Sequence, residues 1–133
     1  MKFTDFKKFK PQLEKDIHKS VCEYLKIAYP KCLFNSDMSG VWLNSYSTKN
    51  SASQLRYAKG YPDIFIPEPR GGYFGLYIEL KSDKGTTSKE QKQWQSDLQD
   101  RGFQALVCKG FDQAKLSIDK YLAYPETLPL NIA

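Results

Sequence analysis

The segment 76–81 alternates between two kinds of side chain, and this alternation constrains the fold more than any other feature of the sequence. One set is apolar and the other carries polar groups: Leu76, Ile78 and Leu80 against Tyr77, Glu79 and Lys81. Successive side chains of a β-strand point to opposite faces, so the segment is predicted to be a strand with one apolar face. A carboxylate and an ammonium then emerge together on its other face.

A second carboxylate precedes another apolar run. Asp63 lies sixteen residues before Glu79 and opens the run 63–66. The connection 67–72 contains two prolines and two glycines, which are typical of a hairpin-type link, so the two strands are predicted to be adjacent. Asp63 then reaches the same place as Glu79. Two carboxylates can hold a hard divalent cation, and a lysine beside them suits metal-assisted hydrolysis of a phosphodiester.

These residues resemble the motif of the PD-(D/E)XK nuclease superfamily, with Pro62-Asp63 followed by Glu79-Leu80-Lys81. Three longer segments, 60–65, 69–81 and 88–94, are similar to the stand-alone VRR-NUC nucleases of phages and bacteria. The likeness runs from about Leu13 to Leu122, which is most of the chain.

The resemblance implies roles for four positions. Asp63 and Glu79 are expected to be metal ligands, with the backbone carbonyl of Leu80 as a further oxygen, and Lys81 is expected to be the catalytic lysine. The expected cofactor is Mg²⁺ or Mn²⁺. The alternative interpretation treats Asp63 as a turn residue after proline, and Glu79 and Lys81 as the solvated face of an edge strand.

Two further family positions are matched by Glu14 in the first helix and Gln91 early in the helix after the lysine strand. Glu14 is therefore a candidate active-site residue and metal ligand, although a first-turn glutamate is also favoured by the helix macrodipole. Gln91 is explained equally well by a capping box with Ser88. His18, the only histidine, stands where many relatives are expected to have glutamine. It could orient a water, or it could be an ordinary polar residue at a helix margin.

The remaining patterns predict the order of the elements. Apolar spacing predicts a helix at 13–29, ended by Pro30. One or two strands are expected within 32–44, and a short helix at 51–58. The strands 63–66 and 73–81 follow, then a helix from Ser88 to about Arg101, closed by Gly102.

A buried strand is predicted at 103–108, followed by a last helix that ends at Leu122. Phe111 before Asp112 resembles a hydrophobic staple onto Leu116 at the start of that helix. Trp42 and Trp94 are expected to belong to the core rather than to stack on bases.

This order predicts an α/β fold with the αβββαβ core of restriction-endonuclease-like proteins, in which helices flank a mixed central sheet. At 133 residues the chain suits one domain. We expect residues 1–12 to form a basic and aromatic arm, 13–122 the nuclease core and 123–133 an extended tail.

Composition limits the partners. Lysine and arginine number 20 against 15 acidic residues, a net charge of +5 that favours a polyanion but is common in proteins that bind none. Three widely spaced cysteines fit a reduced compartment better than a disulfide framework. No stretch is apolar enough to span a bilayer or serve as a signal peptide, so we expect no membrane association and an intracellular protein in a bacterium or phage-infected host.

The sequence thus predicts a metal-dependent nuclease of DNA, structure-selective and acting in phage or bacterial replication, repair or recombination. The rival hypothesis is a nucleic-acid-binding module that kept the fold and lost catalysis. DNA against RNA, nicking against double-strand cutting, flap against junction, and one metal against two stay open. A homodimer is predicted only as one possibility, since a small subunit cuts one strand per site.

Overall fold

The computed structural model describes residues 13–37 and 59–127. Several predictions fall on other positions. The amino-terminal arm, the short helix at 51–58, the second strand before Asn44, Trp42 and the end of the tail lie outside the described residues.

Within these two described ranges, seven elements follow one another in the predicted order. They are α1 (Glu14–Ala28), β1 (Asn35–Ser36), β2 (Ile64–Ile66), β3 (Leu76–Lys81), α3 (Lys89–Asp100), β4 (Gln104–Lys109) and α4 (Gly110–Leu122). The strands form one sheet in the order β1-β2-β3-β4. β2 pairs antiparallel with both β1 and β3, whereas β3 pairs parallel with β4. The mixed sheet and the adjacency of β2 and β3 are confirmed.

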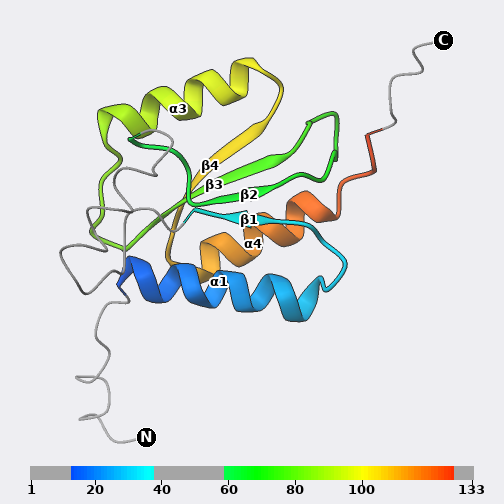
Figure 1. The fold of residues 1–133 in the computed structure, drawn as a ribbon, viewed down its shortest axis with the longest axis horizontal. Helices are drawn as coiled ribbons and strands as arrows, with labels where there is room; N and C mark the ends of the chain where they lie inside the picture. The colour runs from blue at the N-terminus through cyan, green and yellow to red at the C-terminus, as the bar shows by residue number, and fades with distance from the viewer. Residues whose placement is uncertain (1–12, 38–58, 128–133) are drawn as a thin grey trace, which may run out of the picture.

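Helices cover both faces of the sheet (Figure 1). α1 and α4 lie on one side and α3 on the other. The alternation along β3 decides which residues face which helix. Leu76, Ile78 and Leu80 join the larger core with α1 and α4, and Tyr77 joins a second cluster with Leu98 of α3. β3 is thus a central strand with every residue buried, and the solvated edge-strand interpretation of this segment is wrong.

α1 is held in place by its apolar stripe. Ile17, Val21 and Leu25 recur at helical spacing and are almost completely buried. No side chain caps the amino terminus, but Glu14 and Asp16 in the first turn interact favourably with the helix dipole. The helix ends at Ala28, close to the predicted end. It therefore carries Glu14 at one end of the sheet and reaches to the other end.

α3 begins and ends as its capping signals predict. The Ser88 side chain accepts from the Gln91 amide, and the Gln91 side chain accepts from the Ser88 amide, which completes the capping box. Gly102 follows with a φ of 90°, a backbone conformation that residues other than glycine rarely adopt. The bounds of α3 are therefore a local property of the sequence.

The predicted start of the last helix is wrong. α4 begins at Gly110, so Phe111 lies in its first turn and Asp112 is not the N-cap. Leu116, the expected partner of the staple, is 70% exposed. Phe111 instead packs edge-on against Tyr24 of α1, with ring centroids 5.9 Å apart. A contact between helices, which no local pattern encodes, takes the place of the staple.

Two expectations from composition have structural counterparts. The three cysteines are free, as predicted. In the part of the chain that the structure describes, no helix combines the length and apolar character needed to cross a bilayer.

Both central strands start later than predicted. β3 starts at Leu76, and Tyr73 instead forms an isolated bridge to Arg70 in the connection. β2 starts at Ile64, directly after Asp63.

Candidate active site

The predicted acids meet at one end of the sheet. β2 runs antiparallel to β3 with Ile64 opposite Ile78, so the register continued by one residue brings Asp63 beside Glu79. The backbone N–H of Leu80 donates a hydrogen bond of 2.7 Å to Oδ2 of Asp63. Asp63 directly precedes β2, and its side-chain carboxylate accepts the hydrogen bond that a backbone carbonyl of a neighbouring strand would otherwise accept. The turn interpretation of Asp63 is incomplete, because its side chain also fixes the end of β3.

The loop before Asp63 is fitted closely to α3. Gly60 has a φ of 85°, and a Cβ at this position would lie 2.8–2.9 Å from backbone and side-chain atoms of Glu90 and Gln91. Only glycine permits this approach. On the other side, the backbone N–H of Asp37, directly after β1, donates a hydrogen bond of 2.7 Å to the backbone carbonyl of Asp63. Asp63 is therefore held between the start of α3 and the end of β1.

Glu79 is 4% exposed. Its Oε1 accepts a hydrogen bond of 2.6 Å from Nε2 of Gln91 and lies 3.7 Å from Nζ of Lys81. Its Oε2 is buried and finds no hydrogen-bond partner among the described residues. A buried ionised oxygen without a partner is costly, so this atom is suited to a ligand that brings positive charge.

Gln91 takes part in two interactions at once. Its side-chain Oε1 accepts a hydrogen bond of 2.9 Å from the backbone N–H of Ser88 in the capping box, while its Nε2 donates a hydrogen bond to Oε1 of Glu79. The two interpretations of Gln91 are therefore compatible. The cap fixes the amide so that its donor points at the carboxylate of β3.

Lys81 is 8% exposed and lies between two carboxylates. Its Nζ is 3.7 Å from Oε1 of Glu79 and 3.8 Å from Oε1 of Glu14. Glu14, at the start of α1, has about half of its side chain exposed. A Cβ at Gly85 would contact both Lys81 and Glu14, so the loop after β3 packs on this pair. All five predicted side chains thus belong to one cluster.

Glu79, which is buried, and Asp63, which is partly buried, both have raised pKa values. Burial is the largest cause of the raised pKa of Glu79, and the neighbouring charge of Asp63 adds to it, while Lys81 opposes it. Burial also raises the pKa of Asp63, against the hydrogen bond from Leu80. One nearby lysine does not neutralise the cluster, and a cation would favour the ionised form of both acids.

The donor set fits a hard divalent cation. Asp63 and Glu79 supply carboxylate oxygens, one of them the unpartnered Oε2. Within residues 13–37 and 59–127, no group of three or more His, Cys, Asp or Glu side chains has the geometry of a metal site. Two carboxylates and a carbonyl would leave the remaining positions to water or substrate, which is the usual arrangement for Mg²⁺.

The prediction that His18 lies at a helix margin is wrong. His18 is 2% exposed, and its Nε2 lies 2.6 Å from Oγ of Ser36 in β1. Burial lowers the pKa of His18, with an opposing effect from Asp37. Sequence reasoning missed Ser36 and Asp37, which connect α1 to Asp63. A strand is expected within 32–44, but β1 has only two residues, so no periodic signal could show which of its side chains faces α1.

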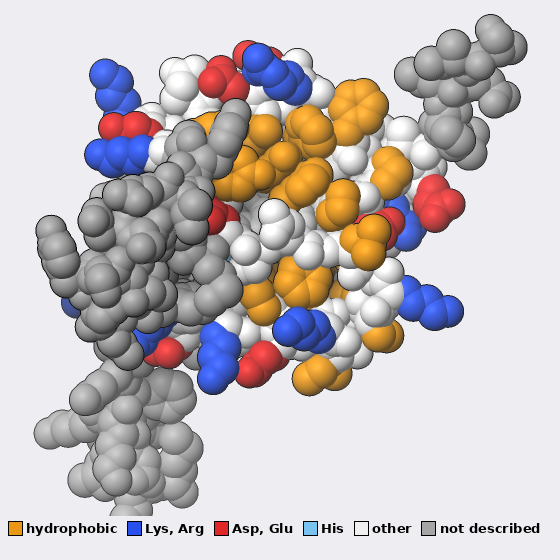
Figure 2. Space-filling model, viewed as in Figure 1, with side chains coloured by type: hydrophobic (Ala, Val, Ile, Leu, Met, Phe, Trp, Pro, Cys, Tyr) orange, Lys and Arg blue, Asp and Glu red, His pale blue; other side chains and the backbone are white. Residues whose placement is uncertain are grey.

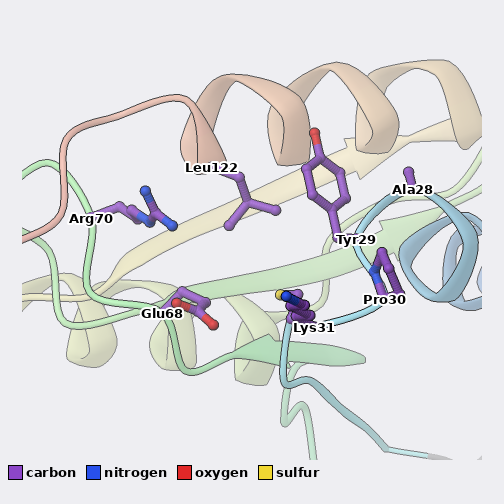
Figure 3. Close-up of a pocket in the computed structure, with 8 residues that line it drawn as sticks. Ala28, Tyr29, Pro30, Lys31, Glu68, Arg70 and Leu122 are labelled. Carbon is purple, nitrogen blue, oxygen red and sulfur yellow. The ribbon is translucent and has the colours of Figure 1, made fainter.

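A cavity of about 440 Å³ lies in a different region (Figure 3). It is lined by the end of α1, by Glu68 and Arg70 of the connection between β2 and β3, and by Leu122 of α4. Glu14 starts α1 and Ala28 ends it, so a helix of about 20 Å separates the cavity from the acidic cluster. The cavity is not part of the candidate active site.

Comparisons with known proteins agree with the predicted family and with the fold. The model of the VRR-NUC domain matches residues 44–112, over half of the chain. A solved structure described as a "VRR_NUC domain protein" is similar in fold, with a TM-score of 0.68 and 23% identity, over 89% of this chain and 94% of that one. No curated protein matched. The chain belongs to the VRR-NUC family, a family of nuclease-type domains with the mixed α/β fold described above.

Proposed function

We propose that the protein is a Mg²⁺- or Mn²⁺-dependent endonuclease that hydrolyses phosphodiester bonds in DNA inside a bacterial or phage-infected cell. One observation carries the proposal. The unpartnered Oε2 of Glu79 lies in a buried cluster with Asp63 and Lys81, and both acids have raised pKa values. A fold that only binds nucleic acid has no need of this cluster, which is costly while it holds no cation.

Asp63, Glu79 and the carbonyl of Leu80 would hold the cation. When bound, a divalent ion supplies charge relief to the phosphoryl oxygens and lowers the pKa of water. Gln91 holds one oxygen of Glu79 and leaves the other free for the ion. Glu14 acts through Lys81, whose ammonium it contacts opposite Glu79.

Lys81 donates hydrogen bonds to the reacting phosphate or to the attacking water. Its ammonium is held by two carboxylates at once and so cannot swing into solvent. A donor fixed in this way can meet charge that develops in the transition state without reorganising first. Glu79 and Lys81 share one strand, which keeps the donor next to the metal ligands.

Exposed cations adjoin the cluster and would contact the DNA backbone. Lys84 follows β3, Lys89 and Lys92 lie in the first turns of α3, and Lys59 precedes the Asp63 loop. Contacts of this kind position DNA without reading its sequence, so affinity should fall steeply with salt. A role in replication, repair or recombination, and a preference for branched DNA, are parts of the proposal.

The test is cleavage by the purified protein. Linear, supercoiled, flap and four-way DNA, and RNA, are incubated with Mg²⁺, Mn²⁺, Ca²⁺ or EDTA. We expect cleavage of DNA with Mg²⁺ or Mn²⁺ and little with Ca²⁺, whose longer and looser coordination disfavours the reaction. DNA binding without cleavage in any metal would instead support the inactive binding module. Sedimentation of the same samples tests the predicted homodimer.

A further inference from the structure

Six aromatic side chains form a continuous set on the α3 side of the sheet. This aromatic strip consists of Tyr61, Phe65, Phe74, Tyr77, Trp94 and Phe103. Its rings contact one another in sequence. Centroids are 5.1 Å apart for Tyr61 and Trp94, 4.2 Å for the stacked pair of Phe65 and Tyr77, and 5.9 Å for Phe74 and Phe103. The strip thus leads from the Asp63 loop to the far end of α3.

The strip is only half covered. Tyr77 is buried beneath α3, four of the other rings are partly buried, and Phe74 is 56% exposed. Figure 2 shows hydrophobic side chains gathered on the surface beside α3, over the strands. An exposed surface of contiguous apolar groups indicates a binding site more often than a single exposed residue does.

Two glycines make room for the outer rings. A Cβ at Gly102 would lie 2.7 Å from the ring of Phe74, and a Cβ at Gly75 would lie 2.8 Å from the ring of Phe65. Each ring therefore packs directly on backbone. This fixes the rings in place and leaves the other side of Phe74 open to solvent.

The strip is continuous with the candidate active site and has cations at both ends. Tyr61 is two residues before Asp63, and Trp94 is one helical turn beyond Gln91. Lys59 is exposed near Tyr61 and pairs with the partly exposed Glu90 at 3.7 Å, and Arg101 is exposed at the end of α3, next to the glycine on which Phe74 packs. Aromatic faces between cations match a nucleic acid strand with its bases turned outward.

We propose that the aromatic strip binds unpaired nucleobases of a DNA strand whose backbone enters the active site. This proposal rests on the proposed nuclease function and specifies its substrate: DNA with a single-stranded part, such as a flap, gap or overhang. Every base has a π-face, so stacking on the strip tolerates any sequence. In an intact duplex the base faces are already stacked on each other and are not available to the strip. A second copy of the chain is the alternative occupant, but the exposed cations favour a polyanion.

Binding in EDTA tests the proposal independently of cleavage. Single-stranded DNA containing 2-aminopurine and a duplex of the same sequence are titrated with the parent protein, Phe74→Ala and Phe74→Trp. Leu116→Ala is the matched control, because Leu116 is also exposed but lies on α4. Stacking contributes about 1–3 kcal/mol per base, or roughly 5- to 150-fold in affinity.

We expect Phe74→Ala to weaken binding of the single strand within this range and to relieve quenching of 2-aminopurine. Phe74→Trp should retain the affinity for the single strand and the quenching of 2-aminopurine. Duplex binding should change less than about twofold in every variant. Phe65→Leu, which keeps the apolar volume but removes a ring face, should weaken single-strand binding in the same way.

Equal losses for single strand and duplex, or no loss in either phenylalanine variant, would overturn the proposal. So would conversion of a dimer to a monomer by Phe74→Ala with unchanged affinity for the single strand, since the strip would then bind a second copy. Cleavage by the parent in Mg²⁺ is measured on the same substrates. If cleavage is absent while the selective binding loss appears, the nuclease function fails and the strip stands as a single-strand site.

Discussion

Two carboxylates of this molecule show opposite electrostatic behaviour. Asp119 of α4 accepts hydrogen bonds from the hydroxyl groups of Tyr24 and Tyr29 and from Nζ of Lys115, the last at 2.9 Å. Burial raises its pKa, but these hydrogen bonds outweigh burial and lower it. Glu79 has one amide donor and one lysine, keeps an oxygen unpartnered, and has a raised pKa.

We propose that this difference separates an acid with a structural role, Asp119, from one with a functional role, Glu79. The donors around Asp119 come from α1, from Tyr29 directly after it and from α4, so the charge of Asp119 ties two helices together. The cluster around Glu79 gathers negative charge that the described residues neutralise only in part. Incompletely neutralised charge of this kind is expected at a functional site, where a ligand completes the neutralisation.

Replacement of the acid by its amide should have opposite consequences at Asp63, beside Glu79, and at Asp119. Asp63→Asn keeps an oxygen that can accept from Leu80 but removes a charged ligand, so the cleavage rate should fall roughly 10³-fold or more. The metal-free protein should be as stable as the parent or more stable, because an acid with a raised pKa destabilises the fold when ionised. Single-turnover cleavage and urea unfolding measure the two quantities. Full cleavage by Asp63→Asn would show that Asp63 is not needed as a charged metal ligand.

Lys81→Met should lower the single-turnover rate by about 10²- to 10³-fold, the usual effect of removing a donor aimed at developing charge. Binding of DNA and metal should change little. Lys81→Arg should rescue poorly, because the guanidinium is bulkier and does not give up its proton. If Lys81→Met cleaves as fast as the parent, the lysine only neutralises its two acidic neighbours.

Gln91 and Ser88 share one capping box, but only Gln91 contacts Glu79. Gln91→Ala should therefore reduce cleavage about 10- to 100-fold, as losses of supporting contacts at metal sites do. Ser88→Ala should cost about 1 kcal/mol of stability, the usual cost of a lost cap, with a much smaller effect on cleavage. Comparison of their rates at saturating metal separates support of Glu79 from capping of α3. Equal rates would assign Gln91 to the helix alone.

Asp119→Asn should leave cleavage unchanged within about twofold. It should destabilise the protein by about 1–3 kcal/mol, because hydrogen bonds to a charged group are lost or weakened. Urea unfolding and the cleavage assay on the same preparation measure both. A loss of activity without a loss of stability would contradict the structural role of Asp119.

Features encoded by neighbouring residues could be predicted from the sequence. The alternation of 76–81, the capping box at Ser88 and the stripe of α1 each depend on fixed spacing, and each is present. Asp63 and Glu79 were brought together by the adjacency of two strands, which the turn-forming connection between them indicated.

Features encoded by contacts between distant elements could not be predicted. The burial of His18 depends on β1, and the position of Phe111 depends on Tyr24 of α1. The buried state of β3 depends on β4 and α3, which the strand's own sequence does not specify. The aromatic strip likewise joins β2, β3, α3 and the residue before β4.

If the unpartnered Oε2 of Glu79 binds a cation, the free energy of unfolding must depend on both pH and Mg²⁺. The folded-state pKa of Glu79 is raised above the ordinary value of 4.5. Its contribution to stability is therefore fully present below pH 4.5 and is lost as the pH rises through the raised pKa.

Without metal, the parent protein should lose stability over this range, and Glu79→Gln should lose less of it, because Asp63, whose pKa is also raised, still titrates in the variant. Above neutral pH, Mg²⁺ should restore the stability of the parent, by about 2.7 kcal/mol at 100 times its Kd, and should have little effect on Glu79→Gln. Identical pH profiles for the two proteins, with no stabilisation of the parent by Mg²⁺ or Mn²⁺, would contradict the claim.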